Sequence, residues 1–338
     1  MSSAPARSAE QAPALRLAFF GTPEFAVPSL ARLLAGRHPV VAVVSQPDRP
    51  RGRGRRPSPS PVAETALAAG VPLLRPERVG DAEIVALLRA AEPDLGVVVA
   101  FGQFLPKAIR ELPRLGYLVN AHASVLPRHR GAAPIASAIL AGDAETGISV
   151  MRVEREMDAG PVALVCRTPI GPEETRGELE PRLAELAADA LAAALDAIAA
   201  GAATWAEQDA ARATHAPKLA RTDGALDFTD DAEALARRVR ALAPRPGAFA
   251  ALGGEPLRLL GARAEPGPVA LPPGTLRVEG GALRVATGRG WLVPTRLQRA
   301  GGRPLDTAEF LRGHPIADGT RLSPMREDAP AIAAVESP

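Results

Sequence analysis

The chain has 338 residues with a formal net charge of +2, and 46% of its residues are apolar. This length exceeds what one hydrophobic core usually supports, so we expect two domains. A charge so close to zero makes attraction of the whole surface to polyanions weak, so any nucleic-acid binding would have to come from local patches. The single cysteine, Cys166, excludes an intramolecular disulfide framework and is expected to be an inert core residue.

The sequence shows neither an export signal nor a membrane segment. Residues 1–13 lack the apolar core of a signal peptide, and no run of about 18 uninterrupted apolar residues occurs. We therefore expect a soluble cytoplasmic protein without membrane association. Residues 1–13 and 323–338 are predicted to be disordered tails.

Short apolar runs alternate with helical patterns from Leu15 onward. Strands are predicted at 15–21, 39–45, 71–76, 94–102 and 117–123. Helices are predicted at 23–36, 61–70, 81–92 and 106–113, with a longer Ala/Leu-rich helix at 176–200. This alternation is typical of an α/β fold with a parallel, doubly wound, Rossmann-like sheet, which binds ligands outside the carboxyl ends of its strands.

The pattern changes after Asp223. One helix at 231–244 precedes strand candidates at 247–252, 257–264, 274–279, 282–288 and 291–298. Gly/Pro turns separate these candidates at intervals of about 8–12 residues, the spacing of a small sandwich or barrel. An OB-like barrel, a common nucleic-acid platform, is one candidate among such small barrels.

These patterns predict two folded domains joined by a linker of weak apolar periodicity. The expected divisions are a tail at 1–13, a Rossmann-like catalytic domain at 14–201, a linker at 202–217, an OB-like C-terminal domain at 218–322 and a tail at 323–338.

The glycine turn after the first predicted strand carries no nucleotide motif. Gly21 begins the sequence GTPEFA, but neither G-x-G-x-x-G nor the P-loop pattern GxxxxGK[ST] is present. We therefore expect a tight strand-to-helix turn at this position, without a site for NAD or ATP.

Asn120 and His122 lie at the end of the strand predicted at 117–123. Side chains at i and i+2 point to the same face of a strand, so the amide and the imidazole are expected to converge. Such a pair suits the stabilisation of a carbonyl oxygen as it becomes an oxyanion. The alternative is a buried structural histidine held by hydrogen bonds. Because the sequence has no HxxxH, HExxH or CxxC pattern, no zinc site is expected.

Asp158 precedes the small residues Ala159 and Gly160. One interpretation is a turn in which the carboxylate caps backbone amides. The other is that Asp158 orients or charges His122, as a carboxylate does in a catalytic triad. No nucleophile is placed beside this pair, because Ser124 lies in no G-x-S-x-G elbow. An amide, an imidazole and a carboxylate without a nucleophile favour acyl transfer to an external nucleophile, and a substrate amine could attack directly.

An arginine-rich segment, Ser45–Pro61, follows the second predicted strand. It contains Arg49, Arg51, Arg53, Arg55 and Arg56. No acidic residue follows Asp48 in this segment, and its Gly and Pro residues exclude a helix. Arginines at the ligand edge of the sheet suit binding of nucleic-acid phosphates. The alternative is a solvated, flexible loop.

Several segments of the chain, in order, resemble the methionyl-tRNA formyltransferase family. They are GTPEFA, QPDRPRGRG, NAHASVLPRHRGAAPI, GDAETGISVM, MDAGPV, KLARTDGALDF and LQRAGGRPLDTAEFLRG, and the resemblance spans about 15–322. The Asn-x-His…Asp set alone specifies only the wider superfamily that uses 10-formyltetrahydrofolate. The arginine-rich segment and the second domain narrow the resemblance to the enzymes that act on tRNA.

The resemblance implies transfer of the formyl group of 10-formyltetrahydrofolate to the α-amine of methionyl initiator tRNA, without a metal. Asn120, His122 and Asp158 are then the catalytic set. The residues expected at the folate site are Phe101, Gly102, Ser124, Val125, Leu126 and Pro127. The residues expected to contact tRNA are Arg49, Arg51, Arg53, Arg55 and Arg56, with Arg53 entering the acceptor-stem region and the OB-like domain gripping the same stem. We expect a monomer whose partners are this tRNA and the folate co-substrate.

Two departures from the family pattern concern fine substrate contacts. His129 stands where the family usually has an aromatic residue, and Ala121 where it usually has a larger apolar one. The alternative functions are another enzyme of the superfamily, acting on a nucleotide sugar or a purine precursor or hydrolysing formyltetrahydrofolate, and a non-catalytic RNA-binding module. The purine enzymes lack a second domain, and the sugar enzymes need no arginine-rich acceptor loop. The joint presence of Asn120, His122 and Asp158 argues against the inert module.

Overall fold

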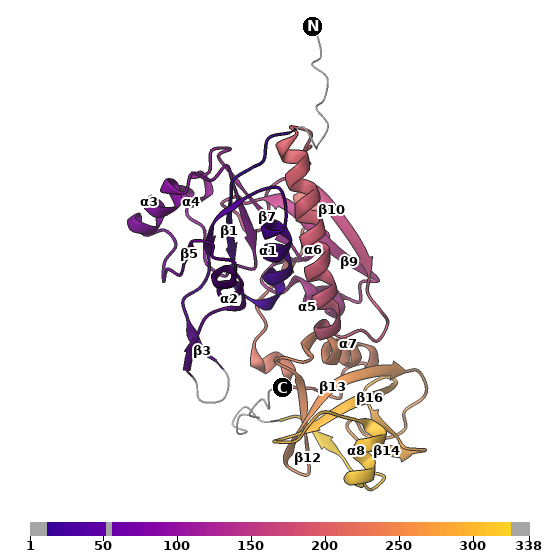
Figure 1. Cartoon of the computed structure of the whole chain (residues 1–338). Helices are drawn as coiled ribbons and strands as arrows, with labels where there is room; N and C mark the ends of the chain where they lie inside the picture. Colours follow the sequence, from indigo (N-terminus) through magenta and orange to yellow (C-terminus); the bar gives the residue numbers. More distant parts are fainter. Residues whose placement is uncertain (1–11, 52–55, 326–338) are drawn as a thin grey trace. The chain divides into compact units, whose positions relative to one another are not determined.

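A computed structural model of the chain describes residues 12–51 and 56–325 (Figure 1). These residues form two compact units. Unit 1 holds the described residues up to Pro134 together with Thr146–Thr168 and Glu180–His215. Unit 2 holds Ile135–Glu145, Pro169–Leu179 and the described residues from Ala216 onward.

Unit 1 is built on a seven-stranded sheet. Its strands are β1 (Leu17–Gly21), β2 (Val40–Val44), β5 (Leu73–Leu74), β6 (Leu95–Val99), β7 (Leu118–His122), β9 (Glu145–Arg152) and β10 (Val162–Pro169), in the order β10-β9-β7-β6-β1-β2-β5. β1 is parallel to β2 and β6, and β7 is parallel to β6. The chain leaves β1 toward β2 and later returns to its other side with β6, so a topological switch point lies between β1 and β6.

The predicted doubly wound fold is confirmed, with one difference at the edge of the sheet. β9 runs antiparallel to β7, so the sheet is mixed rather than wholly parallel. Ser149 pairs with His122 and Arg152 with Val119, which means that β9 begins at the edge where β7 ends. An antiparallel strand added at the edge of an otherwise parallel sheet is a common variation of this fold.

Helices cover the sheet of unit 1, as its buried strands require. The α-helices of the described residues are α1 (Val27–Leu34), α2 (Pro61–Ala68), α3 (Ala82–Ala90), α4 (Lys107–Arg110), α5 (Pro134–Ala141), α6 (Arg176–Ala199), α7 (Ala232–Leu242) and α8 (Thr307–Gly313). The last two, α7 and α8, belong to unit 2. Short 3₁₀ turns lie at η2 (Glu24–Ala26), η3 (Ala210–Arg212) and η4 (Arg221–Gly224). Ser60 caps α2 by accepting a hydrogen bond from the Ala63 N–H at 3.0 Å, and Pro61 follows at the first helical position.

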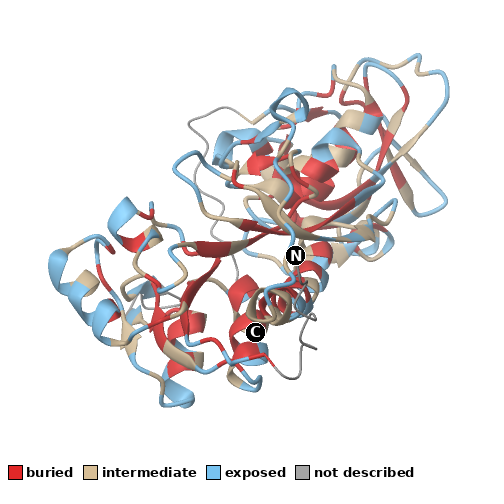
Figure 2. Ribbon diagram, turned by 90° about the horizontal axis from the view of Figure 1, so that it is seen from above, coloured by how far each residue is buried: buried red, intermediate tan, exposed pale blue. Residues whose placement is uncertain are grey.

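Both faces of β1 are buried, which explains its unbroken apolar sequence. Ala18 and Phe20 lie in a cluster with Leu88 of α3 and Ile109 of α4. Phe19, on the opposite face, is fully buried as well. Figure 2 shows buried residues concentrated along the strands and on the inward sides of the helices. A strand that is apolar on both faces is the pattern of a parallel sheet covered by helices on each side.

The turn after β1 brings three strand ends together. A Cβ on Gly21 would lie 2.7 Å from a ring carbon of Phe19, so the tight turn expected there needs glycine. The Thr22 hydroxyl then donates to the Phe101 carbonyl at 2.8 Å, and Gln46 Nε2 donates to the same oxygen at 3.2 Å. The segments that follow β1, β2 and β6 are thus tied at the carboxyl edge of the sheet.

Unit 2 contains a curled antiparallel sheet with the architecture expected of an OB-like domain. Its strands are β12 (Ala248–Leu252), β13 (Glu255–Glu265), β14 (Leu276–Glu279), β15 (Ala282–Ala286), β16 (Trp291–Arg299) and β18 (Leu322–Ser323), in the order β14-β15-β16-β13-β12-β18, and β17 (Leu305–Asp306) pairs with β16. Leu235 and Val239 of α7 pack with Leu257 and Leu259 of β13 in its core. The helix predicted at 231–244 is therefore present, and its apolar face closes the sheet.

Several short elements were not expected from the sequence. β3 (Arg49–Arg51) and β4 (Arg56–Ser58) form an antiparallel hairpin within the arginine-rich segment. β8 (Arg130–Gly131) pairs with β11 (His215–Ala216). Helix α5 was not expected either. Strands of two or three residues carry too little periodicity to be found by pattern, because pairing with another strand is what forms them.

The expectation that Cys166 lies in the core is wrong. Cys166 is only half-buried, because β10 is the outermost strand of its sheet and is partly open to solvent. Burial, with a contribution from the charge of Asp189, still raises the pKa of its thiol. The thiol is therefore held in its less reactive, protonated form.

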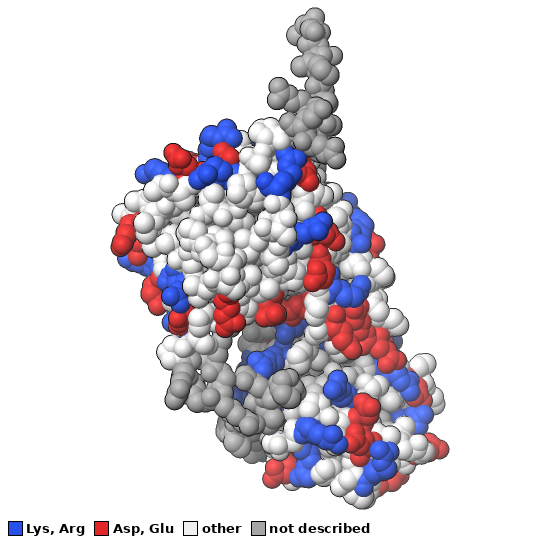
Figure 3. Space-filling model, in the orientation of Figure 1, with Lys and Arg blue, Asp and Glu red and all other residues white. Residues whose placement is uncertain are grey.

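The described surface carries charges of both signs. On the face drawn in Figure 3, acidic and basic side chains are interspersed, as the net charge of +2 leads one to expect. Within the described residues, no helix combines the length and the apolar character needed to cross a bilayer.

Candidate active site

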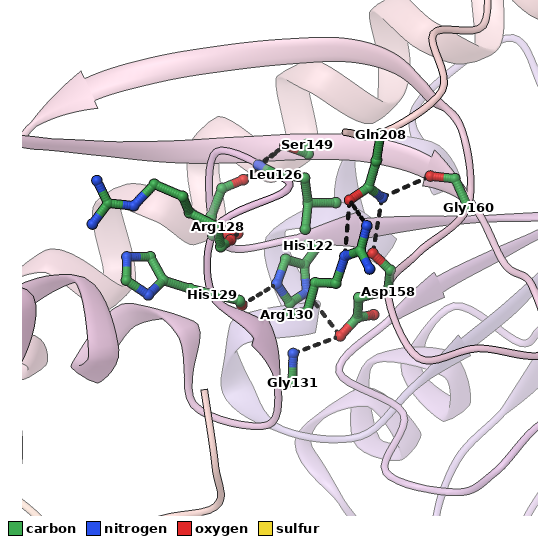
Figure 4. Close-up of polar contacts among 11 residues, drawn as sticks. His122, Leu126, Arg128, His129, Arg130, Gly131, Ser149, Asp158, Gly160 and Gln208 are labelled. Carbon is green, nitrogen blue, oxygen red and sulfur yellow. Dashed lines mark hydrogen bonds and ion pairs between the residues drawn. The ribbon is translucent and has the colours of Figure 1, made fainter. Parts of the chain in front are cut away.

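The candidate site lies in unit 1, beyond the end of β7. β7 supplies Asn120 and His122, and the loop between β9 and β10 supplies Asp158. Figure 4 shows His122 and Asp158 with their polar contacts. Asn120 is half-buried, and its side-chain amide has no hydrogen-bond partner among the described residues. Because it stands two positions before His122 on the same strand, its side chain extends to the same face of the sheet.

His122 is held through both ring nitrogens. Its Nε2 lies 2.9 Å from the carbonyl oxygen of His129, and its Nδ1 lies 3.6 Å from Oδ2 of Asp158. A carbonyl oxygen only accepts, so Nε2 carries the hydrogen in the neutral ring. Nδ1 is the other ring nitrogen, and it faces the carboxylate of Asp158. The side chain is 6% exposed, which shields this pair from bulk water.

Asp158 combines the two interpretations that the sequence left open. Its Oδ2 accepts a hydrogen bond from the Gly131 N–H at 2.9 Å, as a turn-capping carboxylate does, and the same oxygen faces His122. Its backbone φ is +52°, in the left-handed region, which Asp enters more readily than most residues. An unfavourable backbone conformation persists where the surrounding structure enforces it, and such positions gather at functional sites.

The turn after β7 is fixed by hydroxyl groups. Ser124 Oγ donates to the Arg128 carbonyl at 2.6 Å, and Ser149 Oγ donates to the Ser124 carbonyl at 2.7 Å. Ser149 Oγ also accepts the Leu126 N–H at 3.1 Å. The hydroxyl of Ser124 is therefore used inside the turn. This hydrogen bond closes the turn that leads to the His129 carbonyl.

The two residues after β6 that were expected at the folate site differ in solvent exposure. Phe101 is 2% exposed, and its ring packs edge-on against Phe20 with the centroids 5.6 Å apart. Gly102 is exposed and has φ of +84°. At the carboxyl edge of the sheet, the backbone of Gly102 is therefore accessible to solvent, whereas the ring of Phe101 is not. Val125 and Pro127 are half-buried, and Leu126 is buried.

The arginine-rich segment is described only in part. Arg49 lies in β3 and forms an exposed ion pair with Glu77 at 3.1 Å. In the hairpin register Arg51 is paired with Arg56. Arg53 and Arg55 lie outside the described residues. The hairpin follows β2, so it starts from the carboxyl edge of the same sheet.

Three residues near His122 were missed by sequence reasoning. Gln208 Nε2 donates to the carbonyl oxygens of Asp158 and Gly160, at 2.8 and 2.7 Å. Its Oε1 accepts two hydrogen bonds from Arg130, at 3.0 and 2.9 Å. Thr214 Oγ1 accepts the His129 N–H at 2.8 Å. Gln208 and Thr214 fall within the segment predicted to be a linker. No local pattern marks them, because their partners lie about fifty to eighty-five positions earlier in the chain.

The described residues contain no group of three or more His, Cys, Asp or Glu side chains arranged to hold a metal ion. The groups that meet at this buried strand end are an amide, an imidazole and a carboxylate. These groups can stabilise a developing oxyanion and move a proton.

Comparison with known proteins extends over both halves of the chain. Residues 15–195 match a family model described as "Formyl transferase", and residues 218–315 match one described as "Formyl transferase, C-terminal domain". The methionyl-tRNA formyltransferase of Halorhodospira halophila is 49% identical over 308 residues, covering 90% of this chain and 98% of the relative. That of Trichlorobacter lovleyi is 44% identical over 310 residues, covering 91% and 97%.

Solved structures of lower identity share the fold. The sugar 3N-formyl transferase WlaRD, solved in the presence of dTDP and 5-N-formyl-THF, aligns with a TM-score of 0.63 at 14% identity, covering 86% of this chain and 100% of that one. HypX from Aquifex aeolicus, in complex with tetrahydrofolic acid, aligns with a TM-score of 0.57 at 17% identity, covering 88% and 47%. At these identities the likeness establishes the fold alone.

Proposed function

This chain belongs to the formyl transferase family, and on that premise we propose that it formylates the α-amine of methionyl initiator tRNA. The formyl donor in this proposal is 10-formyltetrahydrofolate, and the product serves translation initiation. The observation that carries the proposal is the extent of the similarity. Relatives named methionyl-tRNA formyltransferase align over about nine-tenths of this chain, unit 2 included.

The reaction requires little activation of the nucleophile. A free α-amino group has a pKa of about 7.7–8.0, so a useful fraction is neutral near physiological pH. The amine nitrogen attacks the formyl carbon and a new C–N bond forms. The carbon becomes tetrahedral and its oxygen gains negative charge. The bond to N10 of the folate then breaks, and N10 takes a proton as the amine loses one.

Asn120 and His122 are proposed to stabilise the oxyanion. The Asn120 amide is free to donate, since no described residue accepts from it. On His122, Nε2 is engaged by the His129 carbonyl, so Nδ1 is the ring nitrogen that remains for the reacting oxygen, and it donates when the ring is an imidazolium. Removal of one such oxyanion donor typically lowers kcat by about 10²–10³-fold.

Asp158 is proposed to set the charge and orientation of His122 and to accept the proton of the attacking amine, directly or through water. Its Oδ2 already holds the Gly131 N–H, which fixes the carboxylate while it faces Nδ1. Because the pair lies at a buried strand end, its electrostatic interaction is stronger than it would be in water.

The folate is proposed to lie at the carboxyl edge of the sheet, beside the turn that contains Ser124, Val125, Leu126 and Pro127 and near the backbone of Phe101 and Gly102. Binding ligands outside the carboxyl ends of the strands is the rule for this fold. The pterin ring presents donors and acceptors, and the backbone exposed at Gly102 offers complementary groups.

The tRNA is proposed to contact the arginine-rich segment and the OB-like domain. Guanidinium groups on a hairpin that starts from the ligand edge suit phosphate and base contacts at the acceptor end. The antiparallel sheet of unit 2 is the kind of platform on which OB folds bind nucleic acids.

The deciding assay offers the protein labelled 10-formyltetrahydrofolate with one acceptor at a time. The acceptors are methionyl initiator tRNA, a dTDP-amino sugar and water. The proposal predicts label in the tRNA at a rate far above that of either alternative. Preferential label in the sugar, or release of formate with water alone, would assign the chain to another activity of the same superfamily. Binding of tRNA without any transfer would indicate an inert module.

A further inference from the structure

We infer that Gln208 and Thr214, from the segment predicted to be a linker, are positioning residues that fix the two partners of the His122 ring. The inference rests on the proposed function, because it treats His122 and Asp158 as the catalytic pair. It assigns a role in the reaction to a segment, 205–215, whose sequence resembles a linker.

Gln208 fixes the loop that carries Asp158. One amide nitrogen donates to the carbonyls of Asp158 and Gly160, at 2.8 and 2.7 Å. Both of its hydrogens are therefore used on one turn of the loop. The bond to the Asp158 carbonyl restrains the residue whose φ is +52°. Without this bond the loop is expected to relax, since the left-handed region is unfavourable for a residue with a side chain.

Arg130 links Gln208 to the carboxylate of Asp158. Nε and Nη2 of Arg130 donate to Oε1 of Gln208, at 3.0 and 2.9 Å, and the Arg130 side chain is only 6% exposed. The next residue, Gly131, donates its N–H to Asp158 Oδ2 at 2.9 Å. The backbone carbonyl and the side chain of Asp158 are thus held through one continuous set of hydrogen bonds (Figure 4).

Thr214 fixes the opposite partner of the ring. Its Oγ1 accepts the His129 N–H at 2.8 Å, and its carbonyl accepts the Arg130 N–H at 2.9 Å. His129 has φ of +58°, so its carbonyl direction depends on a strained backbone. That carbonyl receives Nε2 of His122. Thr214 therefore sets the acceptor that fixes the tautomer of the ring.

The segment is docked at its start as well. The Arg152 guanidinium lies 4.2 Å from the ring centroids of both Tyr117 and Trp205. Ala206 and Val162 exchange backbone hydrogen bonds of 2.8 and 2.9 Å. The segment is therefore held against the same loop from Trp205 onward, which keeps Gln208 within reach of its partners.

The test compares Gln208→Ala, Gln208→Glu and the neighbouring control Glu207→Ala in the full-length protein. Glu207 is exposed, and its carboxylate makes no hydrogen bond or ion pair with the described residues. The Gln208→Glu variant keeps an acceptor for Arg130 but loses both donors to the loop. We expect both Gln208 variants to lower kcat on the order of 10²-fold, as a displacement of about 1 Å does, with little change in KM for folate. Glu207→Ala is expected to match the wild type.

A double-mutant cycle separates positioning from general destabilisation. If Gln208 acts through Asp158, then Gln208→Ala should cost less than about twofold when Asp158 is already Ala or Asn. Asp158→Asn is included because it keeps an acceptor for the Gly131 N–H. Full additivity, or unchanged kcat in Gln208→Ala, would overturn the inference. The inference would also be overturned if the loss of kcat in Gln208→Ala disappeared at a lower temperature at which the variant is as fully folded as the wild type.

Thr214 is tested by rescue. Thr214→Val removes the acceptor for the His129 N–H, while Thr214→Ser restores it with a smaller side chain. We expect kcat to fall roughly tenfold in Thr214→Val and to return in Thr214→Ser, because a hydroxyl rather than a packed methyl is required. Equal activity in both variants would contradict the role of Thr214.

A readout independent of substrate distinguishes this inference from the proposed function. Amide hydrogen exchange at Gly131 reports whether Asp158 holds that N–H. Exchange should be faster in Gln208→Ala than in Glu207→Ala or the wild type, whatever reaction the enzyme catalyses. A wild-type protein that fails to formylate tRNA refutes the proposed function. Unchanged Gly131 exchange in Gln208→Ala refutes the inference.

Discussion

Nε2 of His122 lies 2.9 Å from the carbonyl oxygen of His129. In the proposed mechanism this contact decides which ring nitrogen faces the substrate, because a nitrogen that donates to a backbone carbonyl is not available to a second acceptor. Nδ1 remains, 3.6 Å from Asp158. The sequence placed an imidazole at this strand end, and the contact assigns its two nitrogens to different tasks.

The first prediction concerns these two nitrogens. In His122→Asn the amide nitrogen can occupy the position of Nδ1, whereas in His122→Gln the amide reaches the position of Nε2. If Nδ1 is the working atom, His122→Asn should retain more turnover than His122→Gln, with both far below the wild type. The measurement is kcat for formyl transfer to methionyl initiator tRNA. The reverse order of the two variants would show that Nε2 is the reacting nitrogen.

The second prediction concerns Asn120. Its amide has no acceptor among the described residues, so its donor capacity is available to the oxyanion. Asn120→Ala should lower kcat on the order of 10²–10³-fold, with a smaller change in KM. Steady-state kinetics in both substrates checks this. An effect confined to KM would indicate ground-state binding of folate instead.

The third prediction concerns the arginine-rich segment. We expect Arg51→Ala, Arg55→Ala and Arg56→Ala to weaken initiator and elongator tRNA binding alike. Each should also reduce the salt slope by roughly one unit for every phosphate that the variant no longer neutralises. Arg53→Ala should instead reduce kcat/KM most for the initiator, since the resemblance places this arginine in the acceptor-stem region.

Formylation kinetics of these four variants on initiator and elongator methionyl-tRNA, over a salt series, tests that difference. Uniform losses in all four would mean that the segment attracts tRNA without discriminating. Discrimination would then have to be sought in the OB-like domain.

The fourth prediction concerns the pH dependence of stability. His38 is buried, and its Nδ1 accepts the Leu15 N–H at 2.9 Å while Nε2 lies 3.3 Å from Asp196. Burial lowers the pKa of His38 below its ordinary value of 6.5, against the opposing charge of Asp196. The unfolded chain therefore binds the proton more readily than the folded one. The free energy of unfolding should be highest above pH 6.5 and should fall as the pH drops below it.

Urea denaturation across this pH range, on the wild type and on His38→Asn, measures the effect. Asn keeps an acceptor near the position of Nδ1 but does not titrate, so the fall in the free energy of unfolding should become shallower. An identical pH dependence in the two proteins would place the titrating group elsewhere.

Much of the fold follows from residue patterns. The central strands are apolar on both faces, as in β1, and the helices between them carry ordinary caps such as Ser60. The antiparallel direction of β9 could not be predicted from its residue pattern, because the direction of a strand depends on the edge of the sheet at which the preceding connection ends. The pairing of β8 with β11 is likewise set by partners far apart in the chain. Such pairing leaves no periodic trace in either segment.

The candidate site was predictable only where its residues lie close together in the sequence. Asn120 and His122 stand two apart on one strand, and alternation alone brings them together. Asp158 faces His122 from a loop in which its own φ is positive. The only hint of this conformation in the sequence is the pair of small residues that follows Asp158. Gln208 could not be found, because it lies in a segment without pattern and acts through contacts with loops on two other strands.

The most direct test of the catalytic assignment is the single-turnover rate of formyl transfer, with enzyme in excess over methionyl initiator tRNA, for the wild type, His122→Ala and Asp158→Ala. Single-turnover conditions isolate chemistry from product release. The account predicts that each variant stays folded, still binds folate, and transfers the formyl group on the order of 10²–10⁴ times more slowly than the wild type. A single-turnover rate near that of the wild type in either variant would contradict it.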